Sequence, residues 1–374
     1  MHYDFVLSLS DNLKPLGRTL PDPETGILYC DWTLSGVELW FCGRTLLVDL
    51  TALPGAEQER DPLTGQLNER LTWPWCAVIL DDGEQPDRIF EVTQERQTQL
   101  LFHSEEEELH RIRLIKRTEN GKGYLGLAGF WSEGKIVEAP KRLPKKQIVL
   151  IGDSITCGFG NDTRDRNRLF FAADEDGWMS YGAITARLLD MEPTIISSSG
   201  ICLTAYTGWP HPYAMDRLYD YTDRMREDRL GRAALTQWDF AAHPVDYVVL
   251  NLGTNDVNGM ALEGAGGPRH QADAYRAFLE HLRAVHPKAY LICTLGSMDY
   301  YLYSDIESIV EEYVRGTGDC RITVFRYPKM DIADPVGACG HPHIMTHQKM
   351  GHALADFIAA LERESTSDMK GETK

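Results

Sequence analysis

Five nearly continuous apolar segments in the second half of the chain constrain its fold more than any other feature. They lie at residues 147–154, 193–200, 245–253, 289–297 and 321–327. Amphipathic stretches such as 178–191 and 271–287 separate them. Strands that are apolar along their whole length are buried on both faces, so this alternation predicts a parallel sheet with helices on both sides. We therefore predict an α/β domain with a five-stranded parallel sheet.

The first part of the chain has a different pattern. Segments in which apolar and polar residues alternate lie at 36–50, 76–83, 87–94, 97–104 and 108–118. They are rich in β-branched and aromatic residues and are broken by turn signals such as "DDG" and "ENGKG", which is typical of an antiparallel β-sandwich. The segment "EAPKRLPKKQ" that follows is polar, basic and contains two prolines, as domain boundaries often do. We predict a sandwich domain at 1–138, a linker at 139–146 and the second domain at 147–374.

The charge of the chain limits its partners. It carries 38 basic and 56 acidic residues, which gives a net charge of −18 at pH 7. A field of this sign repels nucleic acid and anionic membranes, so we expect neither as a partner. The sequence leaves the oligomeric state open.

Cysteine usage and the amino terminus bear on location. Eight cysteines stand singly, without a C-x-x-C pair, which is typical of reduced thiols. No apolar segment approaches the roughly 20 residues that span a bilayer, and the amino terminus lacks the basic start and apolar core of a secretory signal. We expect a cytoplasmic protein, or a secreted one if a signal peptide has been removed.

Polar and glycine-containing sequences lie where the apolar segments of the second domain end. The first segment ends in Asp153 and Ser154, the second ends in Gly200, and Asn255 follows the third. His341 precedes the last predicted helix. Ligands of open α/β sheets bind at the carboxyl ends of the strands, so we expect these side chains at one rim. A hydroxyl, a base and several hydrogen-bond donors are what nucleophilic acyl transfer needs.

These residues stand in four blocks that resemble the SGNH (GDSL-like) hydrolases. The blocks are Ser154 in "GDSI", Gly200 in "SSSGI", Asn255 in "GTND" and His341 in "GHPH", in the order of that family. The longer blocks "GDSITCGFGN" and "THQKM", with "SGVELWFCGRTLLVDL" upstream, resemble carbohydrate esterase family two more narrowly. Members of that family join an N-terminal jelly roll to a flavodoxin-like SGNH domain and remove acetyl groups from plant polysaccharides.

The resemblance implies a serine esterase that deacetylates plant-derived oligo- or polysaccharides, as acetyl xylan esterases do, through an acetyl-enzyme intermediate. Ser154 is then the nucleophile and His341 the base. The backbone N–H groups of Ser154 and Gly200 and the side-chain amide of Asn255 form the oxyanion hole. The expected partner is an acetylated oligosaccharide, and neither a metal nor an organic cofactor is implied. A lipase or thioesterase of the same fold and a non-catalytic carbohydrate-binding protein are the alternatives.

Each site residue also has a purely structural interpretation. Ser154 can cap the helix that follows it, because serine accepts hydrogen bonds from free N–H groups. Gly200 can be a turn glycine and Asn255 a loop cap. His343 and His347 have the spacing of a zinc site on one helical turn, but they lack the H-E-x-x-H motif and a nearby carboxylate. We therefore predict no metal site.

The residue that orients the histidine is not evident from the sequence. Most SGNH enzymes carry an aspartate three residues before the histidine, where it holds the imidazole in the correct tautomer. Ala338 occupies that position here. Either Asp331 or Asp334 reaches the histidine from the upstream loop, or a backbone carbonyl orients it. We favour the second arrangement, a Ser–His dyad.

Aromatic residues close to the four blocks are candidates for contacts with sugar rings. They are Phe159, Trp178, Tyr206, Trp209 and Tyr300. Aromatic side chains at this density also belong to the cores of proteins. We predict that Phe159, Trp178, Trp209 and Tyr300 bind substrate.

Overall fold

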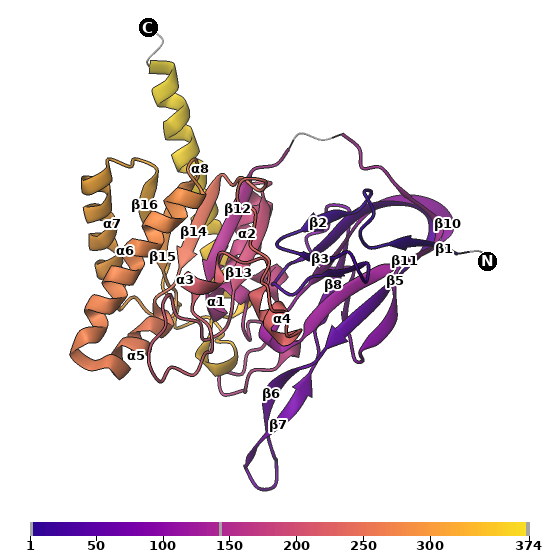
Figure 1. Cartoon of the computed structure of the whole chain (residues 1–374), viewed down its shortest axis with the longest axis horizontal. Coiled ribbons are helices and arrows are strands. Elements are labelled where there is room, and N and C mark those ends of the chain that lie inside the picture. The colour runs from indigo at the N-terminus through magenta and orange to yellow at the C-terminus, as the bar shows by residue number, and fades with distance from the viewer. Residues whose placement is uncertain (1–2, 142–143, 372–374) are drawn as a thin grey trace.

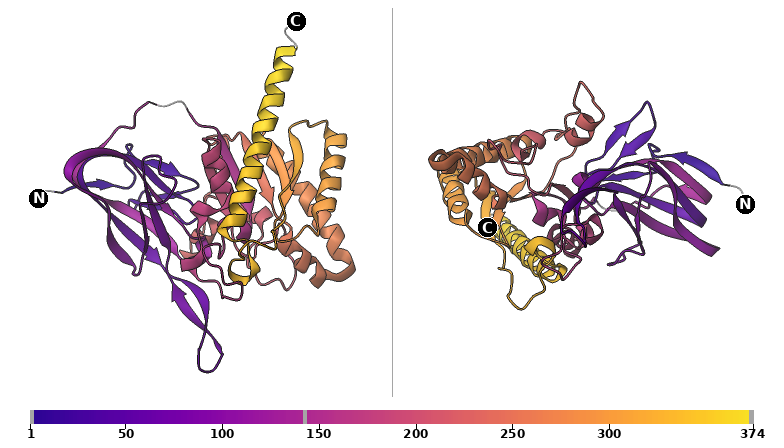
Figure 2. Two further views of the ribbon diagram at one scale, coloured as in Figure 1. Left: turned by 180° about the vertical axis from the view of Figure 1, so that it is seen from behind. Right: turned by 90° about the horizontal axis from the view of Figure 1, so that it is seen from below.

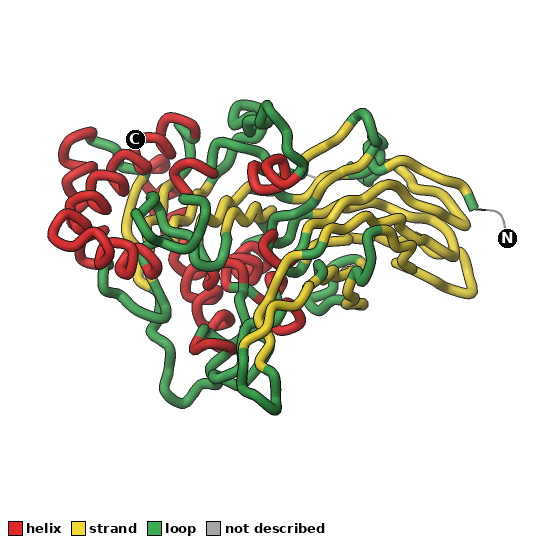
Figure 3. Tube along the Cα trace, turned by 60° about the horizontal axis from the view of Figure 1, so that its bottom comes forward, coloured by secondary structure: helices red, strands yellow, loops and turns green. Residues whose placement is uncertain are grey.

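The computed structural model describes residues 3–141 and 144–371. It places a region of antiparallel strands beside a region of alternating strands and helices (Figure 1). Strands gather in the first region and helices in the second, as Figure 3 shows. The mixed α/β architecture agrees with the prediction.

Eleven strands make up the N-terminal region. They are β1 (Asp4–Leu7), β2 (Lys14–Leu16), β3 (Leu20–Asp22), β4 (Ile27–Tyr29), β5 (Gly36–Leu53), β6 (Gly55–Arg60), β7 (Leu67–Thr72), β8 (Trp75–Leu80), β9 (Arg88–Glu91), β10 (Arg96–Lys116) and β11 (Tyr124–Val137). Nine of them form one sheet in the order β3-β4-β11-β5-β10-β8-β9, with β1 on β11 and β2 on β5. The strands β6 and β7 pair separately.

The long strands β5, β10 and β11 explain how a single sheet can surround the hydrophobic core of the N-terminal region. They pair antiparallel, and their register shifts at bulges such as those near His103 and Gly129. Bulges bend strands and increase their twist, so a single sheet can fold over itself. Alternate residues of β5, among them Leu39, Phe41 and Val48, are buried in the core of this region. The alternation in the sequence marks these residues.

The C-terminal region is built on a five-stranded parallel sheet, as predicted. Its strands are β12 (Gln147–Gly152), β13 (Glu192–Ser197), β14 (Tyr247–Asn251), β15 (Tyr290–Leu295) and β16 (Ile322–Arg326). They lie in the order β13-β12-β14-β15-β16, and every neighbouring pair is parallel. This is the flavodoxin-like order, whose switch point lies at the carboxyl ends of the strands beside β12.

Helices cover both faces of this sheet (Figure 2). They are α1 (Ser154–Cys157), α2 (Tyr181–Leu188), α3 (Met215–Leu218), α4 (Arg224–Arg229), α5 (Thr254–Glu263), α6 (Gly267–Val285), α7 (Tyr303–Thr317) and α8 (Ile344–Gly371). One buried cluster joins the strands to α6 and α7 through residues such as Phe278 and Ile306. A second cluster joins them to α2 and α8 through Ala183 and Leu354. None of the helices in the described part of the chain is both long and apolar enough to cross a membrane.

The described part of the chain has five 3-10 helices, which lie in the connections. They are η1 (Asn120–Lys122), η2 (Ala172–Asp174), η3 (Gly177–Met179), η4 (Gly264–Gly266) and η5 (Ala338–Gly340). Between β11 and β12, residues 138–141 and 144–146 form neither helix nor strand. Residues 142–143 of the predicted linker lie outside the described residues.

The two regions share buried contacts. Trp32 of the N-terminal region is 1% exposed and packs into the cluster on the α6 and α7 face. Its indole Nε1 donates a hydrogen bond to the backbone oxygen of Thr222 at 2.9 Å. Arg18 is also buried, and its guanidinium donates to the backbone oxygens of Tyr219 and Tyr221. The N-terminal region is therefore packed against the parallel-sheet region through side chains that are fully enclosed.

Candidate active site

Ser154 lies at the turn between the first parallel strand and the helix that follows. It is the first residue of α1, and the helix is capped by Asp153, whose side chain accepts a hydrogen bond from the N–H of Ile155 at 3.0 Å. The capping role that the sequence left open for Ser154 thus belongs to its neighbour. The Ser154 hydroxyl instead lies 2.9 Å from Nε2 of His341. This is the distance at which an imidazole can take the hydroxyl proton.

His341 is placed between η5 and the start of α8. Burial lowers the pKa of His341 to about 4, although the backbone groups of Ala338 and Cys339 act in the opposite direction. The imidazole is therefore neutral at pH 7 and able to accept a proton. The ring of Phe159 lies 4.1 Å from the imidazole, measured between centroids, and shields it on one side.

Neither candidate aspartate reaches the histidine. Asp334 binds the ammonium group of Lys349 at 2.6 Å, and Asp331 lies 3.8 Å from the same group. The Nδ1 atom of His341 is enclosed and makes no hydrogen bond to any side chain of the described residues. Its polar surroundings are the backbone of Ala338 and Cys339. The geometry brings Ser154 and His341 together as a pair, and no side chain of the described residues binds the second ring nitrogen of the histidine.

Gly200 lies in the loop after β13. Its φ of +82° falls in the left-handed region, which favours glycine. Its carbonyl oxygen accepts a hydrogen bond from the indole Nε1 of Trp209 at 2.8 Å. Its N–H has no hydrogen-bond partner among the described residues. The free N–H is suited to bind an oxyanion.

Asn255 is the second residue of α5. Its amide donates to the backbone oxygen of Ile201 at 3.0 Å and approaches a carboxylate oxygen of Asp153 at 3.4 Å. The amide thus lies beside the residue that precedes Ser154. The carboxyl ends of β12, β13 and β14 therefore bring Ser154, Gly200 and Asn255 to one rim, as their places in the sequence predict.

Two buried carboxyl groups hold the loops of this rim. Burial raises the pKa of Asp153 to about 7 and the pKa of Asp256 to about 6. Asp256 accepts hydrogen bonds from the N–H of Leu203 at 3.0 Å and from the hydroxyl of Tyr206 at 3.1 Å. Tyr206 is buried. It is therefore a structural residue of the loop.

The predicted substrate-binding aromatics occupy different places. Phe159 stacks on Phe170 at 3.6 Å and borders His341. Trp209 is half-buried beside Gly200. Tyr300 follows β15, and its hydroxyl donates to the backbone oxygen of Tyr327. Phe159 follows α1, whereas Trp209 and Tyr300 lie in the loops after β13 and β15.

Trp178 is a correction to the sequence-based prediction. It is 5% exposed and lies between the guanidinium groups of Arg113 and Arg187, at 5.2 and 4.2 Å from the ring. Its indole donates to the backbone oxygen of Glu84 in the N-terminal region. Trp178 thus joins the two regions and does not face the rim. Its closeness in sequence to the "GDSI" block misled the prediction, because η3 turns the side chain away.

His343 and His347, the two histidines with the spacing of a zinc site, bind backbone groups. The Nδ1 atom of His347 accepts a hydrogen bond from the N–H of Tyr181, and that of His343 accepts one from Met345. Both ring atoms thus accept hydrogen bonds from backbone N–H groups at the start of α2 and α8. The helical spacing of the two histidines is explained by these bonds.

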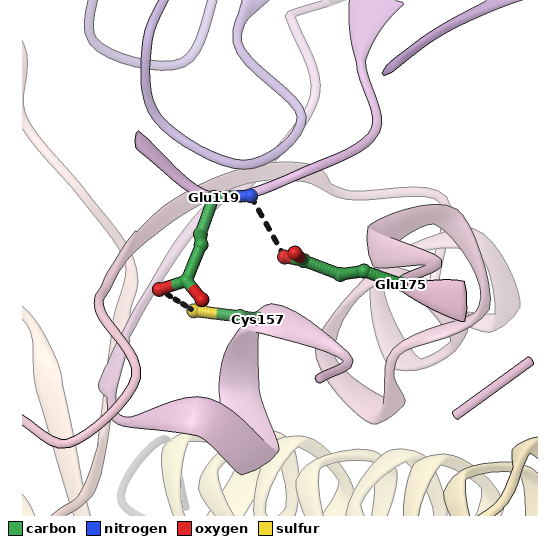
Figure 4. Close-up of side chains that lie close together, drawn as sticks. All are labelled: Glu119, Cys157 and Glu175. Carbon is green, nitrogen blue, oxygen red and sulfur yellow. Dashed lines mark hydrogen bonds between the residues drawn. The ribbon is translucent and has the colours of Figure 1, made fainter. Parts of the chain in front are cut away.

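A buried cluster beside the site was missed by the sequence analysis. Glu119, Cys157 and Glu175 offer ligand atoms that lie within 4.8 Å of one another (Figure 4). The thiol of Cys157 donates to the carboxylate of Glu119 at 3.7 Å, and burial raises the pKa of this thiol. The sulfur is thus a protonated hydrogen-bond donor, unlike the thiolate that binds metals. The segment "ENGKG", which contains Glu119, indicates only a turn at the level of sequence.

Comparisons with known proteins agree with this fold and rim. Residues 150–328 match the GDSL-like Lipase/Acylhydrolase family. Cellulase/esterase CelE of Acetivibrio thermocellus is 34% identical over 335 residues, which cover 88% of this chain and 37% of that protein. The acetylxylan esterase / glucomannan deacetylase of Cellvibrio japonicus is 28% identical over 314 residues, with 82% and 79% covered. The chain thus spans little more than a third of CelE and most of the second relative.

A solved structure matches almost the whole chain. It is a family two carbohydrate esterase from Clostridium thermocellum in complex with cellohexaose, with a TM-score of 0.76 and 31% identity. The match covers 92% of this chain and 98% of that one. Similarity of this extent includes both the N-terminal sheet and the parallel-sheet region. The chain therefore belongs to carbohydrate esterase family two of the GDSL-like (SGNH) hydrolases.

Proposed function

We propose that this protein is a serine esterase that removes O-acetyl groups from plant-derived oligo- or polysaccharides. The observation that carries the proposal is the 2.9 Å contact between the Ser154 hydroxyl and Nε2 of His341. The names of the relatives, acetylxylan esterase and glucomannan deacetylase, support the substrate class. The cellohexaose bound to the similar esterase supports a saccharide chain as the partner.

The first half of the reaction transfers the acetyl group to the enzyme. His341 takes the proton of the Ser154 hydroxyl, and the oxygen attacks the ester carbonyl. The negative charge that forms on the carbonyl oxygen is stabilised by the N–H groups of Ser154 and Gly200 and the amide of Asn255. The tetrahedral intermediate then collapses, and the sugar oxygen leaves with the proton from His341.

The second half releases acetate. Water gives a proton to His341 and attacks the acetyl carbonyl, and the same donors stabilise the second oxyanion. The bond to Ser154 breaks, and the proton returns to its oxygen. The lowered pKa of His341 keeps the ring neutral at the start of each half-reaction. No step uses a cofactor.

Ester hydrolysis by matched variants tests the proposal. The wild-type protein is expected to hydrolyse 4-nitrophenyl acetate, and Ser154→Ala to lose this activity with its circular dichroism and melting unchanged. The cap of α1 is on Asp153, so the substitution leaves the helix intact. A folded Ser154→Ala variant with full turnover would disprove the assignment of the nucleophile.

Two further substrates separate the alternatives. Octanoyl esters cleaved faster than acetyl esters would indicate a lipase-type hydrolase. Release of acetate from acetylated xylan, measured by an enzymatic acetate assay, supports the deacetylase. Binding of cellohexaose or xylan by a protein inactive on every ester would favour the non-catalytic alternative.

The proposal includes a cytoplasmic location. Each of the eight cysteines is a free thiol, and free thiols are typical of a reducing compartment. Fractionation of the source cells, with activity measured in each fraction, tests this part. Activity in the culture medium alone would contradict it.

A further inference from the structure

One loop of the N-terminal region reaches the catalytic rim. It lies between β10 and β11 and contains Glu119, which is 2% exposed. The carboxylate oxygen Oε2 of Glu119 accepts a hydrogen bond from the N–H of Ser199 at 2.6 Å. Ser199 is the residue before Gly200 and lies 80 positions further along the chain. The N-terminal region is thus bound directly to the loop that carries an oxyanion donor.

This bond acts on a segment that the sheet does not hold. The strand β13 ends at Ser197, so the ladder of β12 and β13 stops before Ser199. Gly200 has a positive φ, and no atom lies closer than 3.8 Å to the position that a Cβ would take. Packing therefore does not define the direction of the Gly200 N–H. Hydrogen bonds on either side of this residue have to define it.

Three hydrogen bonds hold the backbone around Gly200. One of them, from the N–H of Ile201 to the backbone oxygen of Ser198 at 3.2 Å, closes the turn that contains Ser199 and Gly200. On one side the N–H of Ser199 is bound by Glu119. On the other side the carbonyl oxygen of Gly200 is bound by the indole of Trp209. The N–H of Ser199 and the carbonyl of Gly200 are therefore both held by hydrogen bonds. The N–H of Gly200 lies between them, has no acceptor of its own among the described residues and keeps one direction. Donors that are oriented before charge develops are the ones that stabilise a transition state most.

Glu119 is itself held in place, both at its backbone and at its carboxylate (Figure 4). Its backbone N–H donates to Oε1 of Glu175 at 2.7 Å, and its backbone oxygen accepts from the ammonium group of Lys116 at 2.6 Å. The thiol of Cys157 donates to the same carboxylate oxygen that binds Ser199. Burial and the charge of Glu119 raise the pKa of Glu175 well above its usual range. The cluster thus fixes Glu119 from three sides.

We propose that Glu119 positions the oxyanion hole, so that the N-terminal region is part of the catalytic apparatus without touching substrate. The inference rests on the proposed esterase mechanism. Glu119 acts through the Ser199 N–H on the direction of the Gly200 N–H. The role of the N-terminal region is therefore to set the geometry of the transition state.

Three substitutions of Glu119 test this role. Glu119→Ala removes the acceptor, and Glu119→Asp shortens the side chain by one methylene, so that neither reaches Ser199. Both are expected to lower kcat roughly 10²-fold, the usual effect of a 1 Å misplacement, with KM within about twofold because ground-state binding does not use the hole. Glu119→Gln keeps a carbonyl oxygen for the Ser199 N–H and is expected to retain kcat within about tenfold. If Glu119→Ala does not fold, the contrast between the Asp and Gln variants decides.

Trp32→Phe is the matched control. It removes one hydrogen bond across the same boundary, from the indole to the backbone of Thr222, but its acceptor is the Thr222 segment and not the loop that carries Gly200. We expect Trp32→Phe to lower the melting temperature and leave kcat unchanged. An equal fall of kcat in Trp32→Phe would show that general loosening of the contact between regions is the cause, which overturns the proposal.

Affinity for methylboronic acid supplies a second readout. The Ser154 oxygen adds to boron and its proton passes to His341, so the boronate carries the negative charge of the transition state. Glu119→Ala and Glu119→Asp are expected to weaken this inhibitor by the factor by which they lower kcat. A folded Glu119→Ala variant with kcat and inhibitor affinity within threefold of wild type overturns the inference. Lack of ester hydrolysis by the wild-type protein would instead disprove the proposed function.

Discussion

At the scale of single residues, no carboxylate of the described residues binds Nδ1 of His341, and this has a measurable consequence. Asp331 and Asp334 are both directed to Lys349. We expect Asp331→Asn and Asp334→Asn each to keep kcat within roughly tenfold of wild type, whereas loss of a triad aspartate costs about 10⁴-fold. His341→Ala, the positive control, is expected to be nearly inactive. A thousandfold loss in either folded asparagine variant would identify a third catalytic residue.

The lowered pKa of His341 predicts the pH dependence of the reaction. Only the neutral imidazole accepts a proton, so activity is lost as pH falls through the pKa of the folded protein, which is about 4. An imidazole with an ordinary pKa near 6.5 would keep only about a tenth of the activity at pH 5.5. We therefore expect kcat/KM at pH 5.5 to stay close to its value at pH 7.5. Measured values that fall tenfold between these pH values would contradict a buried, neutral His341.

At the scale of elements, α2 and α8 define where His341 stands, because α8 begins three residues after it. The two helices approach closely at Gly351 of α8. A Cβ on Gly351 would lie 2.7 Å from a methyl group of Ile184 and 3.0 Å from the backbone oxygen of Tyr181. The carbonyl of Gly351 also accepts a hydrogen bond from Thr185. The glycine is therefore required by packing between helices.

Two glycine substitutions in helices are expected to have opposite effects. Gly351→Ala forces α2 and α8 apart and should lower the free energy of unfolding by roughly 1–3 kcal/mol. A Cβ on Gly316 of α7 meets no atom within 4 Å. Gly316→Ala should raise the free energy of unfolding by roughly 0.5–1 kcal/mol through helix propensity. Urea unfolding of both variants measures this, and effects of the same sign would contradict the packing argument.

At the scale of the whole molecule, buried histidines link stability to pH. The Nε2 atom of His286 shares a hydrogen bond with the hydroxyl of Tyr219 at 2.7 Å. The charge of Arg18, in the N-terminal region, also acts on this imidazole. Burial, together with the charges of Arg18 and Arg283, lowers the pKa of His286 to about 4. The unfolded chain has a histidine pKa near 6.5, so it binds more protons between these values. The free energy of unfolding therefore falls as pH falls from 6.5 to 4.

His286→Gln tests this linkage. The variant removes the titrating group. The free energy of unfolding falls between pH 7.5 and pH 5 in wild type, and we expect this decrease to be roughly 1–2 kcal/mol smaller in the variant. The comparison uses the change with pH, because the substitution also alters packing. The raised pKa values of Asp153 and Asp256 act in the opposite direction in both proteins. Equal changes in wild type and variant would exclude His286 as a source of the pH dependence.

The sequence by itself determined the secondary structure of the C-terminal region. It also determined that the polar residues of the site lie at the carboxyl ends of the strands. Segments such as 147–152 are buried on both faces, so their apolar runs are visible without knowledge of the partners. In the N-terminal region alternation marked the buried residues of β5, such as Phe41. These features depend on local pattern, because the periods of strands and helices are fixed by backbone geometry. The topology of a parallel sheet then brings Ser154 and Asn255 to one rim.

Only the tertiary structure decided how distant side chains meet. It directs Asp334 to Lys349, and no side chain of the described residues binds Nδ1 of His341. It buries Trp178 between two arginines, and it brings Glu119 to the N–H of Ser199. These contacts join elements far apart in the chain. Each depends on how a helix or loop is oriented, because that orientation decides in which direction its side chains point. A single sequence does not encode that orientation as a local pattern, since it results from the packing of the two regions as a whole.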